Sequence, residues 1–152
     1  MLLRIVAVGK IKEAHIKEGV DDYLARIKRY HRVEVKEVKE SSHDGEPGWE
    51  EEGVKLAKVL DPAAFTTVLT PEGTCITTME LAQKLESLMG RGYRSLDFVI
   101  GGHAGLDPAI KKKADFALSL SSLTFPYQLS RLMLAEQIYR CLKIMRGEKY
   151  HR

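Results

Sequence analysis

Two segments in the last third of the chain place glycines and hydroxyl side chains at the ends of apolar runs. Residues 98–105 have the sequence FVIGGHAG, and residues 121–126 have the sequence SSLTFP. Glycines let the backbone approach a ligand without an intervening Cβ, while serine and threonine hydroxyls donate and accept hydrogen bonds. Because ligands of α/β sheets bind at the carboxyl ends of strands, these segments predict a pocket for a small polar molecule.

Neither segment matches a motif that identifies the ligand. The glycines lack the spacing of a dinucleotide-binding fingerprint, and no Walker lysine follows them. A tight structural turn and a ligand loop therefore explain residues 101–105 equally well. His103 has the chemistry of an acid or a base, but the sequence identifies no partner for it, which favours a simple turn residue. Ser121 and Ser122 lack a nucleophile elbow, so we expect them to form hydrogen bonds.

Charged side chains on the last predicted helix form a second group of candidates. Arg140 is explained by ion pairing with Glu136 along an exposed helix face. Arg131 lies near the helix N-terminus, where the helix dipole disfavours a cation, so a contact with a ligand would account for it. Beyond the helix, Tyr150 and His151 are unusual residue types for a disordered chain end.

Apolar periodicity predicts alternating strands and helices that would position these residues. Strand-like runs occupy Leu2–Val8 and residues 33–38, 65–69, 98–100 and 116–120. Helical spacing covers residues 14–30, 49–60, 78–90 and 129–145, with a capping box at Thr77 and Glu80 and a short helix after Asp107. This alternation predicts an α/β fold with a mostly parallel sheet. Residues 41–48 have no apolar side chain and predict a mobile loop.

Length and composition limit the class of protein. The chain has 152 residues, and we expect residues 1–152 to form a single domain. Its two cysteines have no paired metal spacing, which predicts no metal site and reduced thiols in the cytoplasm. No apolar run is long enough to cross a membrane. Basic residues gather near the C-terminus and favour a polyanionic partner, whereas residues 111–113 are explained by a solvated helix end.

Several short motifs, taken in their order and spacing, resemble one family. They are VAVGK at residues 6–10, FVIGG at 98–102 with GL at 105–106, LTFP at 123–126, Arg131 with EQIYR at 136–140, and IMRGE at 144–148 with YH at 150–151. The chain is similar over essentially its whole length to the RlmH-type SPOUT methyltransferases. That family usually has histidine directly after the proline, where this chain has Tyr127.

The resemblance implies a fold, a cofactor and a substrate. The fold is a Rossmann-like α/β domain with a C-terminal trefoil knot, a feature too rare for composition to indicate. The cofactor is S-adenosylmethionine, bound in a bent shape within the knotted loops. The resemblance further implies a homodimer that methylates N3 of a pseudouridine in bacterial 23S rRNA, in the assembled 70S ribosome.

Site residues carry over from the family by position. Those that should surround the cofactor are Leu69, Gly101, Leu120, Ser121, Ser122, Leu123, Thr124 and Phe125. Arg131 would stabilise charge on the target base or bind a phosphate, and Tyr150 or His151 would lie near that base, supplied across the dimer. Because Tyr127 is a poor proton acceptor at neutral pH, His151 becomes the favoured base or orienting group.

Two other functions remain compatible with these residues. One is an RNA-binding module that has lost catalysis; it would keep the basic residues near the C-terminus but need not keep a pocket, so the presence of Gly101 and residues 121–125 argues against it. The other is a SPOUT-fold methyltransferase that acts on tRNA. A fold alone does not decide between RNA substrates.

Overall fold

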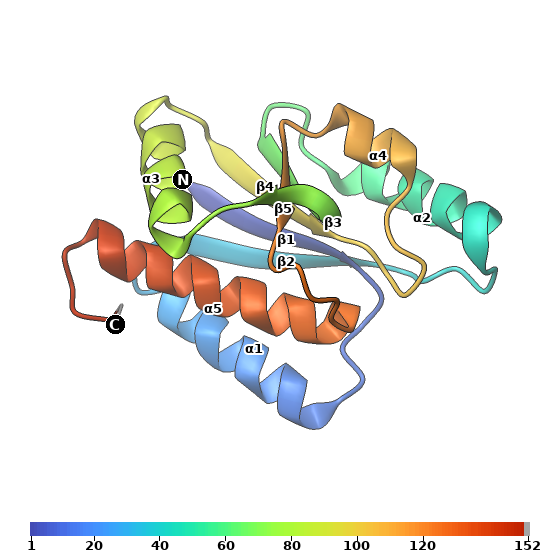
Figure 1. Cartoon of the computed structure of the whole chain (residues 1–152), viewed down its shortest axis with the longest axis horizontal. Helices are drawn as coiled ribbons and strands as arrows, with labels where there is room; N and C mark the ends of the chain where they lie inside the picture. The colour runs from blue at the N-terminus through green and yellow to red at the C-terminus, as the bar shows by residue number, and fades with distance from the viewer. Residues whose placement is uncertain (151–152) are drawn as a thin grey trace.

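The computed structural model describes residues 1–150, in which strands and helices alternate along the chain (Figure 1). The strands are β1 (Leu2–Val8), β2 (Arg32–Val38), β3 (Phe65–Cys75), β4 (Ser95–Ile100) and β5 (Phe116–Ser119). The helices are α1 (Ala14–Ile27), α2 (Gly45–Val59), α3 (Thr78–Gly90), α4 (Pro108–Lys113) and α5 (Tyr127–Met145). The predicted α/β class is confirmed.

The strands form a five-stranded sheet in the order β2-β1-β4-β3-β5, and every pair is parallel. The central strands β1 and β4 are almost completely buried, which explains why their sequences are apolar runs rather than alternating patterns. Parallel pairing brings the carboxyl ends of the strands to one edge. The segments that contain Gly101 and Ser121 leave the sheet at this edge.

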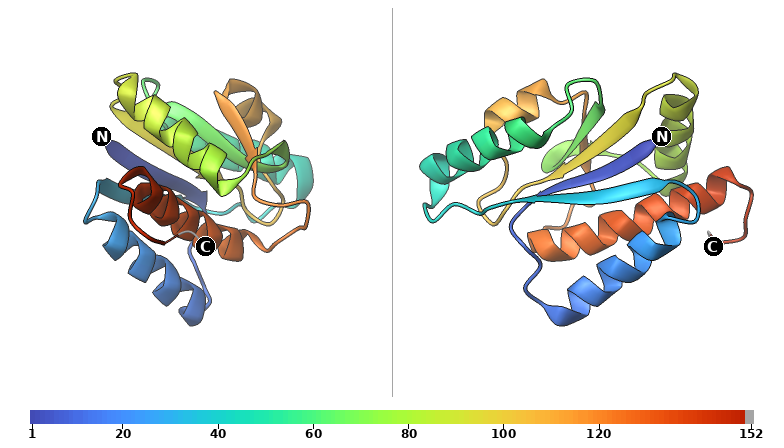
Figure 2. Two further views of the ribbon diagram at one scale, coloured as in Figure 1. Left: turned by 60° about the vertical axis from the view of Figure 1, so that its left-hand side comes forward. Right: turned by 180° about the vertical axis from the view of Figure 1, so that it is seen from behind.

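Helices cover both faces of the sheet (Figure 2). On one face, α1, α3 and α5 pack on alternate side chains of the central strands, including Leu3 and Phe98. On the other face, α2 and α4 pack on Val6 and Val99. The two-residue period of a strand sends neighbouring β1 side chains into opposite clusters. Helix α5 lies between α1 and α3 and contacts both, so it is the central helix of its layer.

The helix ends follow the signals in the sequence. The Thr77 hydroxyl accepts a hydrogen bond from the Glu80 N–H at 3.2 Å, and the Glu80 carboxylate accepts one from the Thr77 N–H at 2.7 Å. This reciprocal pair confirms the capping box of α3. Asp107 caps α4 by accepting from the Ala109 N–H at 2.8 Å. Within residues 1–150, no helix is long and apolar enough to cross a membrane.

The structure corrects the expectation that residues 41–48 form a loop throughout. Helix α2 begins at Gly45, so the second half of that segment is its first helical turn. Pro47 is compatible with this position because N–H groups of a first turn have no acceptor within the helix. The first half of the segment is anchored where the Ser41 N–H donates to Glu52 Oε1 at 2.9 Å.

Strand β3 is longer than the predicted residues 65–69. It continues to Cys75, but its register against β5 shifts between Leu69 and Thr74. Leu69 is also the last β3 residue that pairs with β4. Backbone within the shift passes close to β5, because a Cβ on Gly73 would lie 2.6 Å from the Leu118 carbonyl carbon. The regular ladder therefore ends beside Leu69, where the apolar pattern also ends.

Candidate functional site

A cavity of about 680 Å³ lies at the carboxyl edge of the sheet. Three segments enclose it: the part of β3 that follows Leu69, the glycine loop (residues 101–105), and the connection between β5 and α5. Trp49 of α2 and Lys111 of α4 complete its wall. The sequence-predicted residues that line it are Leu69, Gly101, Leu120, Ser121, Leu123, Thr124 and Phe125, whereas Ser122 is not among the lining residues.

The glycine loop is a tight turn and a cavity wall at the same time. Gly102 and Gly105 form an antiparallel bridge, in which the Gly105 N–H donates to the Gly102 carbonyl at 3.0 Å. A Cβ on Gly101 would lie 2.5 Å from the Gly105 carbonyl oxygen, so the turn itself requires glycine at position 101. The structure confirms the tight turn and places the loop at a cavity wall, whereas its role as a ligand loop stays a prediction.

Hydroxyl groups shape the connection between β5 and α5. Ser119 Oγ donates to the Ser121 carbonyl at 2.9 Å, and the Leu123 N–H donates to Ser121 Oγ at 3.0 Å. The Ser121 hydroxyl thus forms the hydrogen bond expected of it, but with the protein backbone. Leu123 is 71% exposed at the cavity wall.

Arg131 is buried in the N-terminal part of α5 and lines neither described cavity. Its guanidinium donates to Glu37 Oε1 at 2.6 Å and to the Gly9 carbonyl at 2.9 Å. Burial lowers the pKa of Arg131, and the nearby Glu37 carboxylate opposes this effect. Protein acceptors are therefore sufficient to account for a cation at this helix terminus, and a contact between Arg131 and a ligand stays a prediction.

Tyr150 lies beside the C-terminal half of α5. Its ring packs against Tyr139, with ring centroids 5.0 Å apart, and the Arg140 guanidinium lies 4.7 Å from its centroid. Burial raises the pKa of Tyr150 to about 12, so the phenol stays protonated at neutral pH. Tyr139 is about 12 Å from Arg131 along the helix axis, which separates Tyr150 from Arg131 within one chain. His151 lies outside the described residues.

His103 has two partners that sequence reasoning missed. Its Nδ1 lies 3.0 Å from Glu40 Oε1, and its Nε2 lies 3.0 Å from Asp44 Oδ1. Hydrogen bonds to these carboxylates raise the pKa of His103. Both partners belong to the connection between β2 and α2, about 60 residues earlier in the chain. No local pattern could have indicated this contact.

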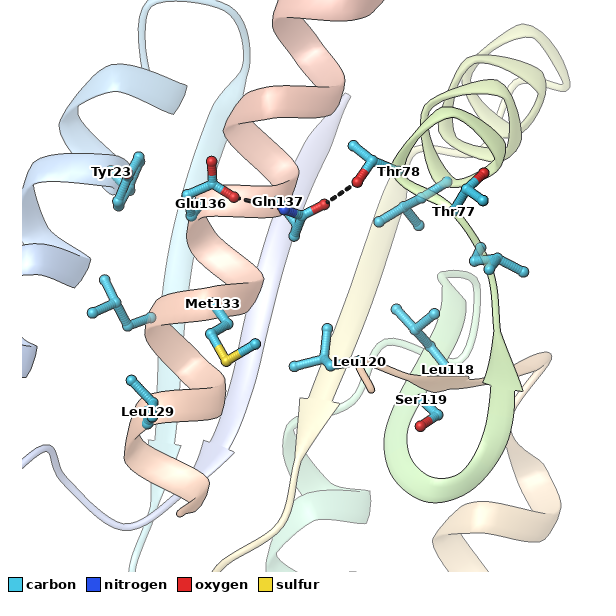
Figure 3. A pocket seen from close by; sticks show the side chains of 13 residues that line it. Tyr23, Thr77, Thr78, Leu118, Ser119, Leu120, Leu129, Met133, Glu136 and Gln137 are labelled. Atoms are coloured by element: carbon cyan, nitrogen blue, oxygen red, sulfur yellow. Dashed lines mark hydrogen bonds between the residues drawn. The ribbon is translucent and has the colours of Figure 1, made fainter. Parts of the chain in front are cut away.

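A second cavity, of about 430 Å³, opens between α3, α5 and β5 (Figure 3). At one end, Thr78 Oγ1 donates to Gln137 Oε1 at 2.9 Å, and Gln137 Nε2 donates to Glu136 Oε2 at 2.7 Å. Ser119 and Leu120 border both cavities. The apolar residues of α5 that line it are Leu129, Leu132 and Met133. These three residues are apolar but lie outside the main buried stripe of α5, and that pattern is the one sequence feature that could have indicated the second cavity.

Charged groups around the sites are partly paired. Lys111 Nζ lies 3.5 Å from Glu72 Oε2 at the wall of the first cavity. Near the C-terminus, Lys143 pairs with Glu148, and the Arg146 guanidinium lies 5.0 Å from the Tyr30 ring centroid. In the part of the chain that the structure describes, no cluster of three or more histidine, cysteine or acidic side chains could hold a metal ion.

Solved structures share this fold. A probable methylase family protein from Haemophilus influenzae aligns with a TM-score of 0.57 and 13% identity, over 99% of this chain and 70% of that chain. A probable methyltransferase from Bordetella pertussis aligns with a TM-score of 0.57 and 12% identity, over 92% of this chain and 95% of that chain. At these identities the likeness shows the fold alone.

Sequence comparisons identify the family. A family model described as "Predicted SPOUT methyltransferase" matches residues 1–151. The ribosomal RNA large subunit methyltransferase H of Acetivibrio thermocellus is 45% identical, over 100% of both chains. The protein of the same name from Desulforamulus reducens is 41% identical, over 99% of this chain and 98% of its own length. With the parallel sheet and the cavity at its carboxyl edge, these matches show that the chain belongs to the SPOUT methyltransferase family, as an RlmH-type member.

Proposed function

We propose that this chain is an S-adenosylmethionine-dependent methyltransferase that modifies N3 of a pseudouridine in bacterial 23S rRNA, in the assembled 70S ribosome. The cavity at the carboxyl edge of the sheet carries the proposal, because the segments assigned to the cofactor by resemblance enclose it. Relatives of 41–45% identity are named as large-subunit rRNA methyltransferases, which supports an rRNA substrate. A ribosomal substrate supports the cytoplasm as the proposed location.

The residues of the cavity fit this cofactor. A volume of about 680 Å³ lies within the range of about 300–1,000 Å³ that is typical of cofactor pockets. Leu69, Leu120 and Leu123 offer apolar walls for the adenine, and the turns on either side offer backbone polar groups. Glu72 and Lys111 offer one charge of each sign to the amino-acid end of the molecule. When bound, S-adenosylmethionine supplies an electrophilic methyl group on its sulfonium sulfur.

The chain's own residues have separate roles in the proposed reaction. The target N3 must lose a proton to become nucleophilic, and His151 is the proposed base or orienting group. Tyr150 keeps its proton at neutral pH because burial raises its pKa to about 12, so its proposed role is to donate a hydrogen bond to the target base or to stack on it. Arg131 is proposed to stabilise charge on the base or bind a phosphate, with Glu37 orienting its guanidinium.

A homodimer would bring these groups together. Tyr150 and Arg131 are separated along α5 in one chain, so we propose that each copy supplies Tyr150 to the cavity of the other. Apolar surface supports α5 as the contact: the partly buried Leu132 and Met133 line the second cavity, and Leu120 joins that cavity to the exposed Leu123 beside the first one. The C-terminal trefoil knot implied by the resemblance is part of the same proposal.

The test is a methyl-transfer assay with tritiated S-adenosylmethionine. Unmethylated bacterial 70S ribosomes are the substrate, tRNA is the comparison substrate, and the labelled nucleotide is mapped. Label at N3 of a 23S pseudouridine is the expected result. Label on tRNA alone would assign the cavity to a different methylation, and cofactor binding without label on either RNA would favour a non-catalytic RNA-binding module.

A further inference from the structure

His103 joins the glycine loop to a distant part of the chain. It is half-exposed at the wall of the first cavity, and its two ring nitrogens each lie 3.0 Å from a carboxylate oxygen, one of Glu40 and one of Asp44. Glu40 also has Lys12 within 3.8 Å, from the connection between β1 and α1. Among residues 1–150, these are the charged groups that form ion pairs with His103 or with its partner Glu40.

The position of a carboxylate oxygen beside each ring nitrogen determines which protonation state of His103 can form both hydrogen bonds. A neutral imidazole has one N–H donor and one lone pair, whereas the protonated ring has two N–H donors. Carboxylates only accept hydrogen bonds when ionised. Both contacts are therefore satisfied only when His103 carries a proton on each nitrogen. Loss of one proton would leave a lone pair facing a carboxylate, which is repulsive.

The segment that contacts His103, residues 40–44, is also tied to α2, which packs against the glycine loop. Next to Glu40, the Ser41 N–H donates to Glu52 Oε1 at 2.9 Å, which ties the segment to the buried Glu52 of α2. Glu52 lies directly against the loop, since a Cβ on Gly102 would lie 3.6 Å from Glu52 Oε2. Residues 40–44 therefore contact the glycine loop through the His103 side chain, and Glu52, to which they are bonded, lies beside the loop at Gly102.

We propose that His103 is a positioning residue, which as an imidazolium holds the glycine loop against residues 40–44 in the conformation that shapes the cofactor cavity. This inference rests on the proposed function, because it takes S-adenosylmethionine as the ligand of that cavity. His103 is assigned no part in methyl transfer. Its effect is on how tightly the loop can hold the cofactor.

The proposal predicts a defined dependence on pH. Carboxylate partners raise the pKa of His103 above its ordinary value of 6.5, so the contact is fully formed below that pH. It is lost as the pH rises through the raised native value. Because His103 is half-exposed and Asp44 is almost fully exposed, the expected weakening of cofactor affinity is about two- to fivefold rather than the larger effect of a buried ion pair.

The first experiment is an NMR titration of the imidazole of His103 in the full-length protein. The expected pKa lies above 6.5, and it should fall in both Glu40→Gln and Asp44→Asn. A pKa at or below 6.5 in the unmodified protein would overturn the proposed contact. This arm needs no cofactor, so it decides the contact whatever the outcome of the functional assay.

The second experiment is calorimetric titration of S-adenosylmethionine at pH 6 and pH 9. The unmodified protein and the control His15→Gln, altered at an exposed position on α1, should show the same loss of affinity between the two pH values. At pH 6, His103→Gln should bind S-adenosylmethionine about two- to fivefold more weakly than the unmodified protein. It should also lack the part of the affinity loss between pH 6 and pH 9 that comes from deprotonation of His103. Equal affinity of His103→Gln and the unmodified protein at both pH values would overturn the positioning role. Absence of binding by the unmodified protein would instead refute the proposed function.

Discussion

Substitution of Gly101 by alanine tests whether the turn of the glycine loop and the shape of the cavity are one structural feature. The new Cβ would lie 2.5 Å from the Gly105 carbonyl oxygen and 3.0 Å from Leu106 Cγ. An ordinary contact begins near 3.4 Å, so the chain must move by about 1 Å on one side. Overpacking of this kind costs about 1–3 kcal/mol.

The same displacement should weaken cofactor binding, because Gly101 lines the cavity. If most of the strain appears in the bound conformation, a cost of about 1–3 kcal/mol corresponds to a roughly 5- to 150-fold rise in the Kd for S-adenosylmethionine. Urea unfolding measures the loss of stability, and calorimetry measures the loss of affinity.

Gly90→Ala is the matched control for this substitution. Gly90 is the last residue of α3, and a Cβ there has no other atom within 4 Å. The control should be neutral or more stable by up to about 1 kcal/mol, because alanine favours the helix, and it should bind the cofactor normally. The reasoning is refuted if Gly101→Ala matches the unmodified protein in both stability and affinity.

Further predictions concern the charged and capping residues. Arg131→Met should reduce the free energy of unfolding by about 1–3 kcal/mol, because it leaves the Gly9 carbonyl and the partly exposed Glu37 without their donor; a loss below about 0.5 kcal/mol in urea unfolding would contradict this role. Thr77→Ala should cost about 1 kcal/mol through loss of the capping box, measurable as a lower Tm. If His151 is the base, the methylation rate should show an inflection near neutral pH, and Tyr150→Phe should leave it unchanged, because the phenol with its pKa of about 12 does not titrate there. Disappearance of that inflection would identify Tyr150 as the base.

Local patterns were sufficient to predict most of the fold. The apolar run of β1 and the reciprocal side chains of Thr77 and Glu80 act within a few residues, so sequence spacing reflects them directly. Residues 45–48 were misassigned because glycine and proline are frequent in loops but are also compatible with a first helical turn. The length of β3 was underestimated because the chain beyond Thr70 is mostly exposed and the strand loses its regular register after Leu69.

The site was predictable where chemistry is local and was missed where it depends on distant contacts. Gly101 and Leu123 follow strands whose order in a parallel sheet brings them to one edge, so the cavity could be expected. The carboxylates of His103 and the acceptors of Arg131 come from other strands and connections, and no spacing in the sequence indicates them. The second cavity likewise depends on how α5 packs between α1 and α3.

The central claim is that the cavity at the carboxyl edge of the sheet binds S-adenosylmethionine, and calorimetry on a cavity-filling variant tests it most directly. Leu69→Trp places a large ring in the cavity, while Val54→Trp makes a matched addition at a position of α2 that is 58% exposed and lines neither described cavity. The account predicts that the unmodified protein and Val54→Trp bind the cofactor equally and that Leu69→Trp binds it at least about tenfold more weakly, a loss of about 1.4 kcal/mol. Equal binding by all three proteins would contradict the assignment of the cavity.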